Sequence, residues 1–576
     1  MKRTILYMIM ILFGLNILLA APEAPKHEFR GVWLSTVANI DWPVQRTDSE
    51  AKKKADLLRY LDTMKETGLN AVVFQVRPSC DAMYPSPLEP WSYWFSGQQG
   101  EGPSTDSLWD PLAFAVEEAH QRGMELHAWV NPYRAVVNPA MADSAGYISE
   151  QHISRQRPDW LLKFNSVYIL DPGKAEVREY ITKVFMDIVN RYDIDGLHMD
   201  DYFYPYSPIQ NEDTLTFIEE NRGITDIHDW RRDNINLLVK MVSDSIDAVK
   251  PWVKWGISPF GIYRPGTPEG IEGFDAWSVL YCDPLAWLEA GTVDYITPQL
   301  YWPFGGGQDY GKLMPWWAEL SQKHKRHFYP GQALYRAASD RFPEGEIPRQ
   351  IRLNREVKGC QGSIFFTANN FYSNPKNTID SLKLDLYRYP ALWPVLEHQA
   401  TNPPDSPKVF SERIPGAVRI GWTPVDNTWA YVIYRGSSRK DLGRDGSSII
   451  HITRDRACTY DDTEEGSWYY AVSALDFHKS ESRLAYTESD FVSPLRPEHR
   501  SSDTFGKVLF RWESFPGAGT YHIQVAADEG FETIIYEERM LSGNRFRKSL
   551  RKGMQYYWRI KADSSNIWSP VWQFER

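Results

Sequence analysis

Cysteine is scarce in this chain, and its few copies lie far apart. The 576 residues contain four, Cys80, Cys282, Cys360 and Cys458, and no CxxC pair. This distribution excludes a disulfide framework and a zinc ribbon, both of which need closely spaced cysteines. We therefore expect mostly isolated thiols.

Clustered positive charge is also absent. The formal net charge is −11, and no long run of lysine or arginine occurs. Because proteins bind nucleic-acid phosphates with clustered basic residues, we expect no nucleic-acid partner. No glycine-rich phosphate loop follows the first predicted strand, which disfavours a doubly wound nucleotide-binding sheet.

Long apolar runs are missing except at the N-terminus. Lys2 and Arg3 precede an apolar stretch that ends at Leu19, followed by the small residues Ala20 and Ala21. This pattern predicts a signal peptide over residues 1–21 and a protein exported to the periplasm, the cell envelope or the medium. The stretch is too short for a stable membrane span, and no cysteine follows it to carry a lipid.

Short apolar runs alternate with amphipathic segments across residues 28–398, which predicts strands alternating with helices. Eight runs have the length of buried strands: Arg30–Ser35, Ala71–Val76, Glu125–Val130, Gly196–Asp200, Val253–Pro259, Tyr295–Tyr301, His327–Gln332 and Gly362–Thr367. The predicted helices include Ala51–Thr67, Leu112–Arg122, Ala175–Tyr192, Asp229–Val249 and Met314–His324. Eight such units predict an α/β fold, a (β/α)8 TIM barrel.

After a proline-rich linker at Thr401–Pro407 the pattern becomes all-β. Two sets of strands recur, each with a tryptophan that ends an early strand and a late aromatic strand. They predict two immunoglobulin or fibronectin III-like sandwiches, over residues 404–492 and 494–576. The linker also predicts a barrel that folds and works by itself when the chain ends at His398.

Two consecutive carboxylates follow the fourth predicted strand. Side chains alternate along a strand, so His198 and Asp200 point into the barrel mouth and Asp201 lies at its lip. A helix cap or a loop salt bridge is the alternative explanation for this pair. Glycoside cleavage needs two carboxyl groups, and Asp200 is our candidate nucleophile or base. For the proton donor, Glu272, Asp275 and Asp283 compete with Asp201, which we favour.

Other strand ends carry aromatic, amide and basic side chains suited to sugar faces and hydroxyls. The chain is rich in aromatic residues, with 23 tryptophans. We predict a substrate-binding role for His198 and for nine further residues: Arg77, His127, Trp129, Asn131, Arg134, Tyr202, Gln299, Tyr301 and Trp302. A core histidine at His127 and loop packing at Trp302 are the alternatives.

Several motifs, in order, resemble glycoside-hydrolase-like family 10. They are Phe29-Arg-Gly-Val-Trp-Leu, Asn39-Ile-Asp-Trp-Pro43, Phe74-Gln-Val-Arg-Pro78, His127-Ala-Trp-Val-Asn-Pro-Tyr-Arg134, Asp195-Gly-Leu-His-Met-Asp-Asp-Tyr-Phe-Tyr-Pro205 and Pro298-Gln-Leu-Tyr-Trp302. The resemblance covers roughly residues 28–395. It implies a bacterial envelope enzyme that cleaves peptidoglycan glycan strands stripped of peptide, with fibronectin-like modules appended.

These observations predict an exported glycoside hydrolase that acts on a polysaccharide or a peptidoglycan glycan strand. A non-catalytic sugar-binding or scaffold protein is one alternative, and a glycan lyase or transferase on the same barrel is another. His127, His198 and Asp200 could converge on an ion, but the chain has no HxxxH motif, so we expect no cofactor and no metal. The oligomeric state does not follow from the sequence.

Overall fold

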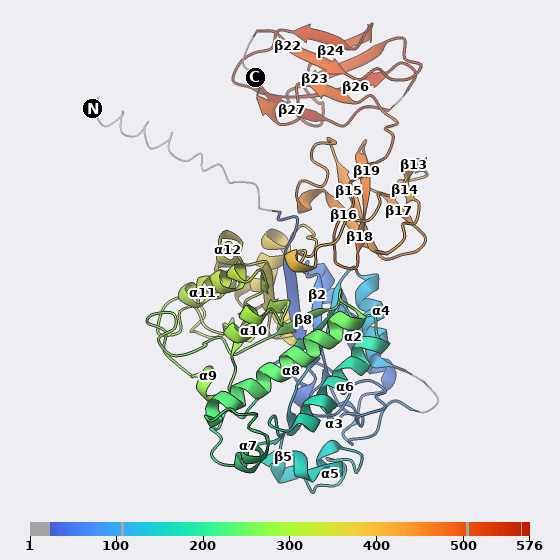
Figure 1. The fold of residues 1–576 in the computed structure, drawn as a ribbon. Coiled ribbons are helices and arrows are strands. Elements are labelled where there is room, and N and C mark those ends of the chain that lie inside the picture. The colour runs from blue at the N-terminus through green and yellow to red at the C-terminus, as the bar shows by residue number, and fades with distance from the viewer. Residues whose placement is uncertain (1–23, 105–108, 503–505, 566) are drawn as a thin grey trace, which may run out of the picture.

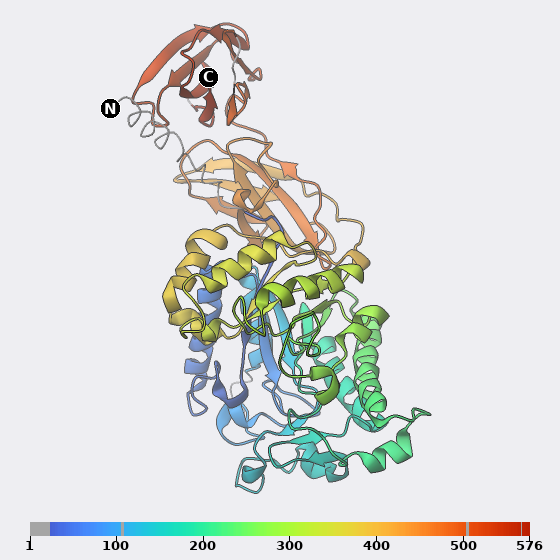
Figure 2. The same cartoon turned by 90° about the vertical axis from the view of Figure 1, so that its left-hand side faces the viewer.

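The computed structural model describes residues 24–104, 109–502, 506–565 and 567–576. The chain forms a barrel and two sandwiches that follow one another in a row (Figures 1 and 2). The predicted signal peptide lies outside the described residues. In the part of the chain that is described, no helix is long and apolar enough to cross a membrane. All four cysteines are free thiols, as expected.

Parallel strands close into the predicted (β/α)8 barrel. The seventh predicted strand completes the ring: its first half, β10 (His327–Phe328), pairs with β9 (Tyr295–Ile296), and its second half, β11 (Gly331–Gln332), pairs with β12 (Gly362–Phe365). The remaining strands follow the order β8-β7-β3-β2-β1. They are β1 (Phe29–Leu34), β2 (Ala71–Arg77), β3 (Glu125–Val130), β7 (Gly196–Met199) and β8 (Lys254–Ile257).

Helices surround the barrel and begin where capping residues stand. Ser49, Asp110 and Asp226 each accept hydrogen bonds from backbone N–H groups of the first turn of the helix that follows. All five predicted helices form. The main helices are α2 (Glu50–Glu66), α4 (Pro111–Gln121), α6 (Ala175–Arg191), α8 (Ile227–Val249), α10 (Pro284–Ala290), α11 (Tyr310–Lys323) and α12 (Glu346–Glu356).

Shorter elements lie in the loops at the carboxyl ends of the strands and after β12. They are α3 (Tyr93–Ser96), α5 (Ile153–Gln156), α7 (Thr214–Glu220), α9 (Ala276–Val279), α13 (Thr378–Ser381) and a small sheet of β4 (Arg134–Val136), β5 (Leu161–Lys163) and β6 (Tyr168–Leu170).

Both C-terminal regions are sandwiches of two sheets with largely antiparallel strands. The first consists of β13 (Val409–Ile414), β14 (Ala417–Trp422) and β17 (Thr459–Asp462) against β16 (Ile449–Thr453), β15 (Thr428–Gly436), β18 (Tyr469–Asp476) and β19 (Ala485–Tyr486). The second consists of β20 (Pro494–Arg496), β22 (Val508–Trp512) and β25 (Arg545–Lys548) against β21 (Ser501–Ser502), β27 (Trp572–Glu575), β26 (Gln555–Ala562), β23 (Tyr521–Ala526) and β24 (Ile534–Leu541). The fibronectin III label stays a prediction.

The first sandwich packs on the barrel through a shared core. Along β15, Tyr431 and Ile433 belong to the cluster inside the sandwich, whereas Val432 and Tyr434 belong to a cluster on the barrel side. That second cluster continues into the barrel with Phe29, Ala71, Tyr295, Tyr329, Leu392 and Trp393. The four-stranded sheet is thus buried on both faces. This continuous core favours a barrel that folds together with the first sandwich; the independent barrel stays a prediction.

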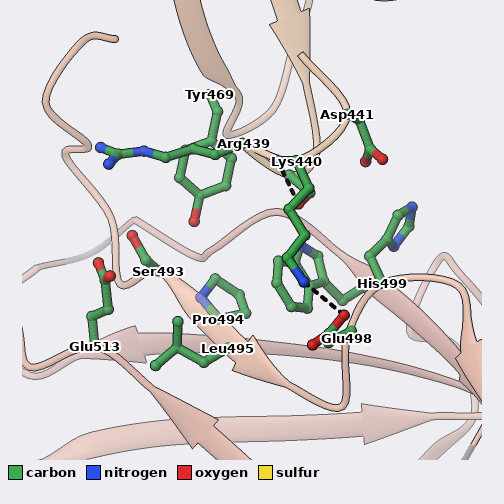
Figure 3. Close-up of a pocket in the computed structure, with 12 residues that line it drawn as sticks. Arg439, Lys440, Asp441, Tyr469, Ser493, Pro494, Leu495, Glu498, His499 and Glu513 are labelled. Carbon is green, nitrogen blue, oxygen red and sulfur yellow. Dashed lines mark hydrogen bonds and ion pairs between the residues drawn. The ribbon is translucent and has the colours of Figure 1, made fainter. Parts of the chain in front are cut away.

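A more polar joint connects the two sandwiches (Figure 3). Lys440 of the first forms a 2.8 Å ion pair with Glu498 of the second, and the Lys440 side chain is 74% exposed. The Trp572 indole donates a 2.7 Å hydrogen bond to the carbonyl of Ser437. Exposed ion pairs contribute little stability, so this joint is weaker than the joint between the barrel and the first sandwich.

Candidate active site

A cavity opens at the carboxyl ends of the barrel strands, on the side away from the sandwiches. It contains both predicted catalytic residues and five of the predicted substrate-binding residues: Asp200, Asp201, Trp129, Arg134, Tyr202, Gln299 and Tyr301. Their strand ends meet here because parallel strands in a closed barrel all finish at the same rim.

Asp200 is a buried carboxylate held by donors from the neighbouring strand. Trp129 donates from its indole to Oδ2 at 3.0 Å, and the Asn131 amide donates to Oδ1 at 2.9 Å. Burial raises the pKa of Asp200, and the positive charge of Arg134 and these two donors oppose the rise. Asn131 does not line the cavity, but it orients the carboxylate that does.

Asp201, the next residue, accepts fewer hydrogen bonds than Asp200. The Tyr206 hydroxyl donates to its Oδ2 at 2.6 Å. Burial, together with the negative charge of Asp200, raises the pKa of Asp201 to about 7, although the bonds from Tyr206 and Gln299 lower it. At neutral pH this carboxyl therefore holds its proton for a large fraction of the time.

The other proton-donor candidates are engaged elsewhere. Asp275 caps α9 by accepting from the Ser278 backbone, and Asp283 caps α10 while it accepts weakly from Trp277. Neither of them lines the cavity, and neither does Glu272. Among the four candidates, only Asp201 reaches it.

Arg134 and Tyr202 form one rim of the cavity. The guanidinium carbon of Arg134 lies 4.5 Å from the centroid of the Tyr202 ring, and its Nη2 donates to the carbonyl of Pro78 at 2.9 Å. These contacts fix a positive charge beside Asp200. Tyr202 remains 40% exposed, so the face of its ring is accessible at the cavity entrance.

The two predicted histidines lie inside the barrel, below the cavity. His198 contacts the Trp33 indole nitrogen at 3.1 Å and the Tyr295 hydroxyl at 3.0 Å. His127 lies deeper, between Tyr295 at 2.8 Å and Glu125 at 3.1 Å. Both side chains are fully buried, so neither meets a substrate directly.

Arg77 points away from the cavity, contrary to the strict alternation assumed from the sequence. Gln75 pairs with Trp129 across the strands, but Arg77 pairs with Val130, because the register shifts at the residue between them. This bulge turns Arg77 outward. There it forms a buried 2.6 Å ion pair with Glu89.

The sixth strand contributes Gln299 and Tyr301 to the cavity but not Trp302. Gln299 donates to the carbonyl of Ser258 at 3.2 Å. Trp302 packs edge-on against Phe260, with ring centroids 5.7 Å apart, and does not line the cavity. The loop-packing alternative for Trp302 therefore fits the structure better than a stacking role.

Seven cavity residues were outside the predicted set: Trp33, Ser35, Val37, Ile40, Gln75, Ser258 and Phe366. Alternation along β1 places Trp33 on the inner face of the barrel, so the sequence did contain a signal that could have identified it. Gln75 Oε1 accepts from the backbone of Thr36 at 2.9 Å and Val37 at 2.8 Å, which fixes its amide. Its Nε2 is buried and has no hydrogen-bond partner among the described residues.

No group of three histidine, cysteine, aspartate or glutamate side chains is placed to hold a metal ion among the described residues. The cavity is lined by two carboxyl groups, amides, an arginine and aromatic rings. Residues 28–343, more than half of the chain, match the sequence profile described as Glycosyl hydrolase-like 10. The chain belongs to the Glycosyl hydrolase-like 10 family.

Relatives extend the similarity beyond the barrel. Glycosyl hydrolase YngK of Bacillus subtilis (strain 168) is 36% identical over 502 residues, covering 83% of this chain and 96% of that protein. Glycosyl hydrolase DigH of Escherichia coli (strain K12) is 35% identical over 374 residues, covering 60% and 84%. The solved glycoside hydrolase domain of PgaB (BpsB) from Bordetella bronchiseptica aligns with 63% of this chain and 99% of its own, at 14% identity and a TM-score of 0.41. The fold assignment depends on the strand order and not on that weak likeness.

Proposed function

We propose that this chain is an exported glycoside hydrolase that cleaves within a polymeric amino-sugar glycan, namely peptidoglycan strands without stem peptides. The observation that carries the proposal is the pair of buried carboxyl groups, Asp200 and Asp201, at the barrel mouth. Their different partners suit them to the two roles that glycoside cleavage requires.

In this reaction Asp201 is the acid and Asp200 the charged partner. Asp201, whose pKa is raised to about 7, protonates the leaving glycosidic oxygen. Asp200 accepts from Trp129 and Asn131, which favour its ionised form, so that it attacks or stabilises the anomeric carbon, or activates water. Retention and inversion both remain compatible with these roles.

The cavity lining supports a sugar as the substrate. Trp33, Tyr301 and Phe366 line the cavity with aromatic rings, on which sugar faces stack, and Gln75 and Gln299 line it with side-chain amides. The entrance is open, because Ile40 is 41% exposed and Tyr202 is 40% exposed. An open rim suits a polymer that passes through the cavity.

The choice of peptidoglycan depends on the family and on the predicted export. An exported enzyme meets envelope or environmental polymers, and the resemblance narrows these to cell-wall glycan. The test is incubation with purified glycan strands, with and without peptides, beside plant and capsular polysaccharides. Short oligosaccharides released only from bare strands support the proposal; activity confined to an uncharged plant glucan or xylan contradicts the substrate but keeps the glycosidase.

A further inference from the structure

A lysine from the first sandwich is buried against the amino-terminal ends of the barrel strands. Lys479, in the loop between β18 and β19, is only 3% exposed. Its Nζ lies 3.4 Å from Glu125 Oε1 and 3.1 Å from Asp195 Oδ1. It also lies 3.6 Å from the centroid of the Trp429 ring. The sandwich thus supplies a countercharge to two buried barrel carboxylates.

The backbone at Lys479 has an unfavourable conformation. Its φ is +66°, in the left-handed region that disfavours a residue with a Cβ and suits glycine or asparagine. A lysine here is consistent with a requirement for its side chain rather than with the needs of the turn.

A chain of hydrogen bonds leads from this charge cluster up to the cavity. Glu125 Oε2 lies 3.1 Å from His127 Nε2, and His127 Nδ1 lies 2.8 Å from the Tyr295 hydroxyl. The same hydroxyl lies 3.0 Å from His198 Nδ1, and His198 Nε2 lies 3.1 Å from the Trp33 indole nitrogen. Trp33 lines the cavity that contains Asp200.

The two ends of this chain fix the direction of every proton within it. The Trp33 indole only donates, so His198 Nε2 must accept and a neutral His198 carries its proton on Nδ1. Tyr295 then accepts from His198 and donates to His127 Nδ1. His127 therefore carries its proton on Nε2 and donates to Glu125, which has to be ionised to accept it.

A protonated Glu125 would reverse the donor and acceptor roles along this series of hydrogen bonds. It would donate to His127, and each proton of the hydrogen-bond chain would move to the other partner. His198 Nε2–H would then donate to the Ser258 hydroxyl, 3.1 Å away, and the Trp33 N–H would face another N–H in place of its acceptor. Lys254, at 2.7 Å, and Lys479 both hold Glu125 in its ionised form. The titratable and charged groups that face Glu125 are Lys254, Lys479, His127, Asp195, Tyr295, His327 and Tyr329.

We propose that Lys479 is a positioning residue: from the sandwich, through Glu125, His127, Tyr295 and His198, it fixes the Trp33 indole in the active-site cavity. The effect on turnover rests on the proposed glycosidase function, but the proton arrangement does not. Loss of the Lys479 charge leaves Lys254 to hold Glu125 alone, so Glu125 takes up a proton at a higher pH and Trp33 loses its acceptor.

The test compares the full-length variants Lys479→Met and Lys479→Arg with Lys440→Met, a matched control at the exposed joint between the sandwiches. We expect the kcat of K479M, relative to that of the wild type at the same pH, to fall about tenfold or more at pH 5 and to return to the wild-type value at pH 8, where Glu125 is again ionised. K479R keeps the wild-type profile, because it keeps the charge, and so does K440M. A K479M protein that loses thermal stability while its kcat–pH profile remains that of the wild type overturns the inference.

The tautomer of His198 and the activity of a Tyr295→Phe variant test the same hydrogen bonds. In ¹⁵N-histidine-labelled protein, His198 should carry its proton on Nδ1 in the wild type and shift toward Nε2 in K479M at low pH. This readout needs no turnover, so it decides the inference even where the wild type cleaves no glycan. If K479M does not fold, Tyr295→Phe breaks the same chain and leaves the charges in place; a wild-type kcat in Y295F contradicts the inference.

Discussion

The Trp129 indole nitrogen donates a 3.0 Å hydrogen bond to Oδ2 of Asp200. Both side chains come from adjacent strands, since β3 and β7 pair and place Trp129 opposite His198. The two residues lie at the cavity, and both are at least nine-tenths buried. A donor aimed at a buried carboxylate favours its ionised form, so this contact helps to make Asp200 the charged member of the pair.

Trp129→Phe keeps a ring but removes this donor. We expect kcat/KM to fall about 10- to 100-fold, the scale of one hydrogen bond to a charged group of about 1.5–3 kcal/mol. The acid limb of the pH profile should move to higher pH, because Asp200 loses a bond that lowers its pKa. A pH–rate profile on any cleaved glycan measures both effects, and an unmoved acid limb would exclude Asp200 as the group that titrates there.

The raised pKa of Asp201 predicts a basic limb near pH 7. A proton donor is competent below its pKa, so activity should fall as the pH rises through about 7. Tyr206→Phe removes a hydrogen bond to the ionised carboxylate, which raises this pKa further and moves the limb upward. If the limb stays in place in Y206F, the proton donor is another group.

The same shift has a consequence for stability. Because the folded pKa of Asp201 lies above its ordinary value of 3.8, folded protein binds this proton more tightly than unfolded chain does. Asp201 therefore favours folding most below about pH 4, and that contribution is lost as the pH rises to about 7. Asp201→Asn should flatten this part of the curve of unfolding free energy against pH, measured by denaturant titration.

Substitution of Arg77 should lower stability, whereas substitution of Arg134 should mainly change the kinetic constants. Arg77→Met breaks a buried ion pair with Glu89, at a cost of about 3–5 kcal/mol, and should lower Tm while the folded enzyme keeps its KM. Arg134→Met removes a charge beside Asp200 and a contact with Tyr202, so it should change KM and kcat with a smaller loss of Tm. A raised KM with a wild-type Tm in R77M would return Arg77 to the substrate site.

Truncation should separate the two sandwiches. A chain that ends at His398 exposes the core around Phe29, Tyr295 and Tyr329 and removes Lys479, so we expect aggregation or loss of activity. A chain that ends at Val492 loses only the second sandwich and its polar joint, and should keep its activity on short glycans. Solubility by size-exclusion chromatography and turnover are the measurements. A soluble, active 24–398 chain would show that the shared core is dispensable.

The barrel was predictable because its strands are buried on both sides and so appear as apolar runs in the sequence. Alternation beyond such a run also identified Asp200, and the same rule applied along β1 would have placed Trp33 on the inner face. Alternation gave the wrong orientation for Arg77, because a bulge in β2 shifts the register there. Nothing in the amino-acid composition of the strand indicates this bulge. The role of Trp302 could not be predicted for a related reason. Its ring packs edge-on against Phe260 from a loop, and loops have no side-chain periodicity.

The link between barrel and sandwich was not predictable at all. Lys479 and Asp195 are 284 positions apart, and their contact depends on how two separately patterned regions pack together. The proline-rich linker led to the prediction that the barrel folds independently of the sandwiches. Such a composition shows where secondary structure ends, but it does not show which surfaces pack across the boundary. Ala430-Tyr-Val-Ile-Tyr434 of β15 is a continuous apolar run buried on both faces, but such a run does not say which surface covers its second face.

The most direct test of the account is hydrolysis of bare peptidoglycan strands by the wild type and by Asp200→Asn, followed as new reducing ends. Asparagine keeps the shape of Asp200 and removes its charge, so we expect release of short oligosaccharides by the wild type and at least ~100-fold slower release by D200N at equal folded concentration. Equal rates for the two proteins on a glycan that the wild type cleaves would contradict it.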